Sequence, residues 1–136
     1  MTSEIGFEVR LNQPYDQVLE ITKEALKAEG FGVLTSIDVK ATMKEKIDVE
    51  FRPYSILGAC NPPLAHRILT EEAVAGLLLP CNVTVEAEDD NTSIVRIANP
   101  QVILGVGSLE QNSEISAVAQ EARNRLERVA EALLST

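Results

Sequence analysis

Aromatic residues and cysteines are scarce in this chain. It has three Phe, two Tyr and no Trp, so the core must be built mainly from Val, Ile, Leu and Ala. Aromatic platforms on which the bases of single-stranded nucleic acid could stack are therefore not expected. The two cysteines, Cys60 and Cys81, are too few for a disulfide framework. We expect both to be reduced thiols in a cytoplasmic protein.

Positive charge is also in short supply. The chain carries 12 basic against 21 acidic residues, a formal net charge of −9. The densest basic group, Arg123, Arg125 and Arg128, is interleaved with acidic residues. A negative field repels both phosphate backbones and anionic lipid surfaces. The composition therefore disfavours nucleic acids and membranes as partners.

Long hydrophobic runs are missing as well. The longest uncharged apolar stretch, residues 73–85, contains a glycine, a proline and an asparagine and is too short to cross a bilayer. The first four residues have neither a basic region nor the start of an apolar one, so no signal peptide is expected. With 136 residues and 45% hydrophobic content, the chain fits a single domain spanning residues 1–136.

Hydrophobic periodicity predicts most of the secondary structure. Alternating or β-branched stretches indicate strands at residues 5–11, 31–39, 54–59, 77–87 and 93–98. Apolar residues at helical spacing indicate helices at 14–29, 62–74 and 112–134, with one or two further turns at 41–47. The segment 99–107 is expected to be a loop, and the acidic run 86–90 a solvated hairpin tip.

This order of elements, β-α-β-β-(α)-β-β-α, favours an α+β fold. We expect an antiparallel sheet with the helices packed on one face. Pro80 cannot donate a hydrogen bond to a sheet, so the strand at 77–87 is expected at an edge or with a bulge.

Two short stretches carry a resemblance to a known family. A strand ending in Gly-Ala-Cys-Asn-Pro at 58–62 is followed by Leu-Leu-Pro-Cys at 78–81. This pairing resembles the signature of Domain of Unknown Function 302, and the order of elements fits over nearly the whole chain. The resemblance implies a bacterial or archaeal protein with a fold like that of the TATA-box-binding protein, associated as a homodimer. It implies no reaction.

Cys60 and Asn61 stand where a strand meets a helix. Asn61 is a suitable N-cap, and a helix N-terminus can hold an anionic ligand, although Pro62 and Pro63 remove two N–H donors. An exposed Cys60 at this place would have a lowered pKa and react readily. The alternative is a small buried hydrophobic residue that resists modification, and this is the result we expect.

Two functions remain open on these residues. No acid–base pair, activated nucleophile or cofactor motif is visible, which favours a non-enzymatic, homodimeric small-ligand-binding or interaction module. The apolar segment 102–104 also suggests a surface that a partner copy covers. The candidate ligand-binding residues are Cys60, Asn61, His66 and Cys81.

The alternative is a thiol-dependent redox protein or a soft-metal protein that binds zinc or copper through Cys60, His66 and Cys81. Ligating or catalytic groups must converge. Cys60 and His66 in one open pocket, with polar atoms within about 4 Å, would favour this alternative.

Overall fold

The computed structural model describes residues 4–136. Its elements, in chain order, are β1 (Gly6–Leu11), α1 (Tyr15–Ala28), β2 (Gly32–Asp38), α2 (Val39–Ile47), β3 (Tyr54–Cys60), α3 (Pro62–Glu71), the 3-10 helix η1 (Ala73–Leu78), β4 (Cys81–Asp89), β5 (Thr92–Ala98), α4 (Pro100–Ile103), the 3-10 helix η2 (Gly107–Gln111) and α5 (Ser113–Leu134).

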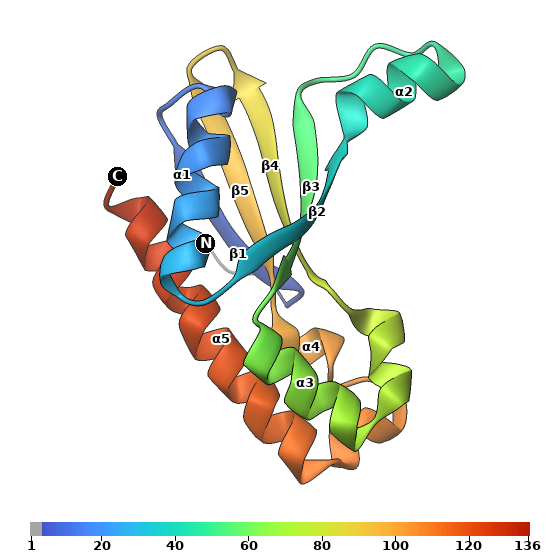
Figure 1. The fold of residues 1–136 in the computed structure, drawn as a ribbon. Coiled ribbons are helices and arrows are strands. Elements are labelled where there is room, and N and C mark those ends of the chain that lie inside the picture. Colours follow the sequence, from blue (N-terminus) through green and yellow to red (C-terminus); the bar gives the residue numbers. More distant parts are fainter. Residues whose placement is uncertain (1–3) are drawn as a thin grey trace.

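The five strands form one antiparallel sheet in the order β1-β5-β4-β3-β2. Helices α1 and α5 lie side by side across one face of this sheet (Figure 1). The α+β class and the placement of helices on one side of an antiparallel sheet are thus confirmed. At one end of the sheet α3 and η1 extend the molecule, and at the other end α2 projects beyond β2 (Figure 1).

The core lies between the sheet and α1 and α5. Helix α5 presents a stripe at helical spacing, and all its members are buried: Ile115, Val118, Ala122, Leu126, Val129 and Leu133. The inward residues of the strands alternate, as in Phe7, Val9 and Leu11 of β1. This alternation matches the two-residue period of a strand with one covered face. Aliphatic side chains supply nearly all of the core, as the composition predicts.

The strand predicted at 77–87 begins later than expected. Leu77 and Leu78 belong to η1, and β4 starts at Cys81. The expected edge position is wrong, because β4 lies between β3 and β5 near the middle of the sheet. Pro80 stands just outside the strand, so its missing N–H costs no ladder hydrogen bond. The irregularity in β4 lies at its far end, between Ala87 and Asp89.

Two helix boundaries also differ from the prediction. Helix α3 ends at Glu71 rather than at residue 74, because the chain is extended at Glu72 before η1 begins. The predicted loop at 99–107 contains the short helix α4. Asn99 Oδ1 accepts a hydrogen bond from Gln101 N at 3.0 Å, and Pro100 fills the first helical position. The turns predicted at 41–47 are confirmed as α2.

The acidic run 86–90 is only partly a solvated hairpin tip. Glu86 is 5% exposed and forms ion pairs with Arg52 and Arg96 on the sheet face opposite the helices. Burial alone would raise the pKa of Glu86, but the hydrogen bonds from Arg96 and Arg52 outweigh it and leave that pKa lowered. A carboxylate buried in this way needs its partners.

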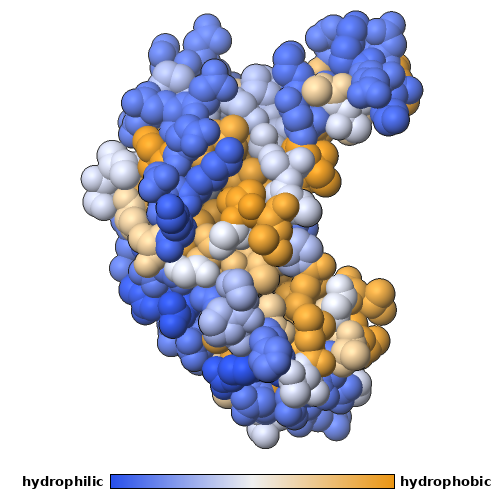
Figure 2. Space-filling view, in the orientation of Figure 1, coloured by the Kyte–Doolittle hydropathy of each residue, from blue (hydrophilic) through white to orange (hydrophobic). Residues whose placement is uncertain are grey.

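One side of the molecule is hollowed and apolar. The space-filling view shows hydrophobic side chains gathered in a hollow between the α2 end and the α3–η1 end (Figure 2). The exposed large hydrophobic residues of β2, α2, α3 and η1 are Leu34, Ile37, Ile47, Leu69, Val74 and Leu77. Helix α2 buries no residue at all. Between residues 4 and 136, no helix is both long and apolar enough to cross a bilayer.

Candidate functional site

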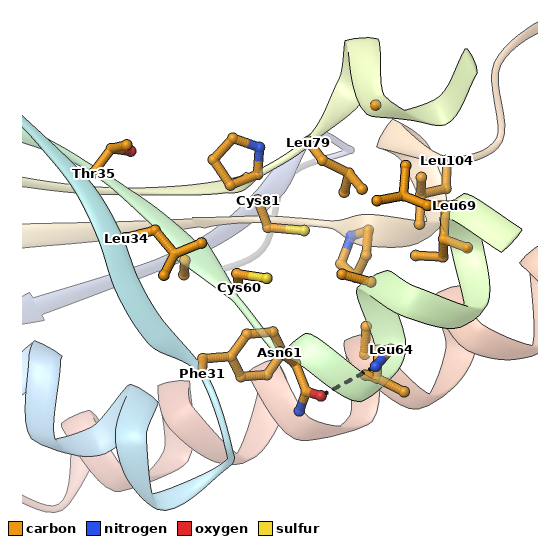
Figure 3. Close-up of a pocket in the computed structure, with 17 residues that line it drawn as sticks. Phe31, Leu34, Thr35, Cys60, Asn61, Leu64, Leu69, Leu79, Cys81 and Leu104 are labelled. Carbon is orange, nitrogen blue, oxygen red and sulfur yellow. Dashed lines mark hydrogen bonds between the residues drawn. The ribbon is translucent and has the colours of Figure 1, made fainter. Parts of the chain in front are cut away.

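The two cysteines lie at neighbouring strand ends. Cys60 is the last residue of β3, and Cys81 is the first residue of β4. In the ladder between these strands Ala59 is the direct partner of Cys81, so Cys60 lies one position beyond that partner, where the regular ladder ends. Both sulfur atoms point into the same cavity in Figure 3. The structure therefore brings together two residues that stand 21 positions apart in the sequence.

This cavity has a volume of about 300 Å³ and opens on the hollowed side of the molecule. Its walls come from the start of β2, the end of β3, helix α3, the turn after η1 and the C-terminal helices. Most of the lining side chains are aliphatic or aromatic: Phe31, Leu34, Leu64, Ala65, Ile68, Leu69, Leu79, Pro80 and Leu104. Thr35, Asn61 and the two thiols are the polar members.

Close packing fixes the strand ends that carry the thiols. A Cβ on Gly58 would lie 2.1 Å from Thr35 Oγ1 and 2.7 Å from Pro80 Cγ, distances at which atoms overlap. Only glycine therefore lets β2 and the residue before Cys81 approach β3 so closely. Pro80, which follows a cis peptide bond, forms part of the pocket wall.

Asn61 acts as the expected N-cap of α3. Its Oδ1 accepts a hydrogen bond from Leu64 N at 3.3 Å, and Pro62 and Pro63 occupy the first turn. Asn61 is buried, and its Nδ2 would lie 2.9 Å from a Cβ on Gly30, a residue with φ +84. The Oδ1 atom of Asn61 is thus engaged in starting the helix. With two prolines in that first turn, the helix offers few free N–H groups to an anion.

The thiols are not activated. Burial raises the pKa of Cys60, and burial followed by the nearby Cys60 raises the pKa of Cys81 to about 11. A lowered pKa of Cys60 was expected only if its thiol were exposed. In the structure Cys60 is half-buried, so that condition is not met. Both thiols are consequently protonated at neutral pH and are poor nucleophiles in that state.

His66 does not join the thiols. It is exposed on α3, beside a shallow depression lined by Arg67, Thr70, Glu71 and Glu114. It is not among the residues that line the cavity with Cys60 and Cys81. Across residues 4–136, no group of three or more His, Cys, Asp or Glu side chains is placed to hold a metal ion. The structure brings together Cys60, Asn61 and Cys81 of the four candidate residues.

Sequence reasoning missed most of the cavity wall. Phe31 directly precedes β2, Leu34 lies on β2, and Leu69 is an exposed residue of α3. The one available signal was the run of apolar residues at 77–80, which is too hydrophobic for a solvent-exposed connection.

The comparisons with known proteins agree with this architecture. The crystal structure of an uncharacterized conserved protein DUF302 from Bacillus stearothermophilus superimposes with a TM-score of 0.82 at 27% sequence identity. The match covers 96% of this chain and 98% of that chain. No curated protein matches the sequence. The profile of the family described as Domain of unknown function DUF302 matches residues 7–133, and the chain therefore belongs to the DUF302 family.

Proposed function

We propose that this domain binds a small, uncharged and largely apolar ligand in the cavity beside Cys60 and Cys81, without catalysing a reaction on it. The observation that carries the proposal is the lining, in which aliphatic side chains surround very few polar atoms. Ligand sites are typically concave and mostly apolar, with a small number of polar groups that orient the ligand. Here the Thr35 hydroxyl and the two thiols fill that orienting role.

The charge state of the ligand follows from the same lining. An anion would lose its hydration in this cavity and find no cationic side chain among the lining residues. Asn61 Oδ1 already accepts the capping hydrogen bond, and the first turn of α3 holds two prolines that lack N–H groups. These features disfavour a carboxylate or phosphate and support a neutral ligand.

The volume sets the size of the ligand. About 300 Å³ lies at the lower end of the range of ordinary ligand pockets. Since a water molecule takes up about 30 Å³ of liquid, the cavity accommodates a ligand of roughly ten non-hydrogen atoms. A ligand of that size binds with micromolar affinity when each atom contributes about 0.8 kcal/mol.

A displacement assay tests the proposal. The small uncharged fluorophore 1-naphthylamine should bind with a blue-shifted emission, and octan-1-ol should displace it far better than octanoate. Ala65 lines the cavity, so Ala65→Leu should weaken fluorophore binding at least tenfold. Ala117→Leu, on the exposed face of α5, is the matched control and should leave binding unchanged. Equal displacement by octanoate, or unchanged binding in Ala65→Leu, contradicts the proposal.

We also propose that the domain acts as a homodimer. The segment 102–104 supports this less than the sequence suggested, because Leu104 is buried within the same chain. The support comes instead from β2 and α2, where Leu34, Ile37 and Ile47 are exposed on an edge strand and a helix that buries nothing. Sedimentation equilibrium at micromolar concentration should give the dimer mass, and a monomer mass would overturn this.

A further inference from the structure

We propose that Cys60 and Cys81 together bind one soft monovalent cation, Cu(I), as a two-sulfur site in the wall of the cavity. The inference does not rest on the apolar ligand proposed above. In this proposal the metal site has two ligands, both thiolates, and takes a soft monovalent ion. His66 is not a ligand.

The first support is the placement of the two sulfur atoms. The strand ladder sets Cys81 opposite Ala59, and Cys60 follows Ala59 directly. Both side chains enter the same cavity (Figure 3). Their backbones are held by the sheet and by the tight contact of Gly58 with Thr35 and Pro80. The backbones of both donors are therefore ordered before any metal arrives, which lowers the entropy cost of binding.

The second support is the donor set, which selects the metal. Structural zinc takes four ligands in a tetrahedron. In the part of the chain that the structure describes, no third His, Cys, Asp or Glu completes a group with the two thiols. Thiolate sulfur is a soft ligand that favours Cu(I). Cu(I) has a filled d shell and accepts two thiolates in a nearly linear arrangement, so two sulfurs satisfy it.

The third support is the surroundings of the thiols. Apolar side chains such as Phe31, Ile68 and Leu79 line the cavity with them. Such a shell limits access of water to a metal site and so protects the reduced ion. An apolar shell of this kind favours Cu(I), which is unstable in water, and disfavours a metal ion that keeps its hydration shell.

Binding of Cu(I) to the two thiols should release two protons. Each thiol gives up its proton to solvent, and Cu(I) forms two Cu–S bonds. The bound site keeps one net negative charge, which the metal and both sulfurs share and which half-buried Cys60 leaves partly in contact with solvent, unlike the charge of a free anion enclosed in the cavity. No electron is transferred. Burial raises the pKa of both thiols, so the cation competes with protons throughout the neutral range. The apparent affinity should therefore rise about 100-fold per pH unit near neutrality, tenfold for each proton released.

The test is a competition for Cu(I) against bicinchoninate, with the reduced protein, without oxygen, and at pH 6.5 and 7.5. We expect one Cu(I) per chain and the 100-fold rise in affinity, after correction for protonation of the chelator. Cys60→Ala and Cys81→Ala should each weaken binding at least 100-fold. His66→Ala, on the exposed side of α3, should change nothing. Unchanged affinity in either cysteine variant, a loss in His66→Ala, or a tenfold rise with pH overturns the proposal.

A second measurement on the native sequence covers the case in which Cys81→Ala fails to fold. One equivalent of Cu(I) should protect both thiols from iodoacetamide at pH 8.5, as read by mass spectrometry of the peptides. One equivalent of Zn(II) should protect neither. Protection of a single thiol, or equal protection by Zn(II), overturns the two-sulfur site.

Discussion

Replacing Gly58 by alanine tests how strictly the close approach of three strands fixes the thiol-bearing ends. The new methyl group would lie 2.1 Å from Thr35 Oγ1 and 2.7 Å from Pro80 Cγ. The Thr35 side chain can rotate away, but the pyrrolidine ring of Pro80 cannot, so a shift of backbone is required. Overpacking of this kind costs about 1–3 kcal/mol, and we expect a loss of about 2 kcal/mol in the free energy of unfolding.

Gly32 offers a matched control in the same sheet. A Cβ on Gly32 would meet nothing within 4 Å. Gly32→Ala should therefore leave the free energy of unfolding unchanged or raise it by about 0.5 kcal/mol, through the reduced freedom of the unfolded chain. Urea denaturation followed by circular dichroism measures both variants, and an unchanged m-value keeps the comparison valid.

A double variant separates the two overlaps at position 58. Thr35→Ala removes the nearer contact, so Gly58→Ala should cost less in the Thr35→Ala background than in the native chain. Equal free energies of unfolding for Gly58→Ala and Gly32→Ala would refute the reasoning, because the predicted difference comes from the surroundings of position 58 alone.

Two further predictions concern titrating groups. The pKa of Glu86 is lowered in the folded state. Burial alone would raise this pKa, but the hydrogen bonds from Arg96 and Arg52 lower it by more. Its stabilising effect is thus complete above the unfolded pKa of about 4.3 and is lost as the pH falls further. Glu86→Gln should cost about 1 kcal/mol in urea unfolding at pH 7 and less at pH 3.5; an equal cost at both values contradicts this. At pH 7 iodoacetamide should label half-buried Cys60 slowly and buried Cys81 more slowly still, because both pKa values are raised. Rapid, selective labelling of Cys60 in a peptide-resolved time course would contradict the site described here.

The fold was largely predictable because its elements have strong periodicities. The buried stripe of α5 recurs every three or four residues, and β1 alternates between buried and less buried residues. The position of β4 in the sheet was not predictable from Pro80, because the prediction depended on where the strand begins. Once β4 begins at Cys81, the proline lies outside the ladder and constrains nothing within it.

The candidate site was predictable only in part, for a geometric reason. Cys60 and Asn61 are marked by their place at the start of a helix, but the partners of Cys60 come from β2 and β4, distant in sequence. His66 illustrates the opposite case. Leu64 and Ile68 of α3 are buried, and His66 lies two residues from each, a rotation of about 200° on a helix. Spacing along the helix alone would have placed it on the outer side.

The exposed α2 has a consequence for hydrogen exchange. A helix of nine residues that buries none of them is held mainly by its own backbone hydrogen bonds, by the Asp38 cap and by the bond from Lys40 Nζ to Phe51 O. Short helices without packing open readily in water. In an isolated chain the amides of α2 should therefore exchange with deuterium at nearly the rate of an unstructured peptide, while those of α5 are protected. Slow exchange of the α2 amides would therefore show that another molecule, such as a second copy of the chain, packs against this helix in solution.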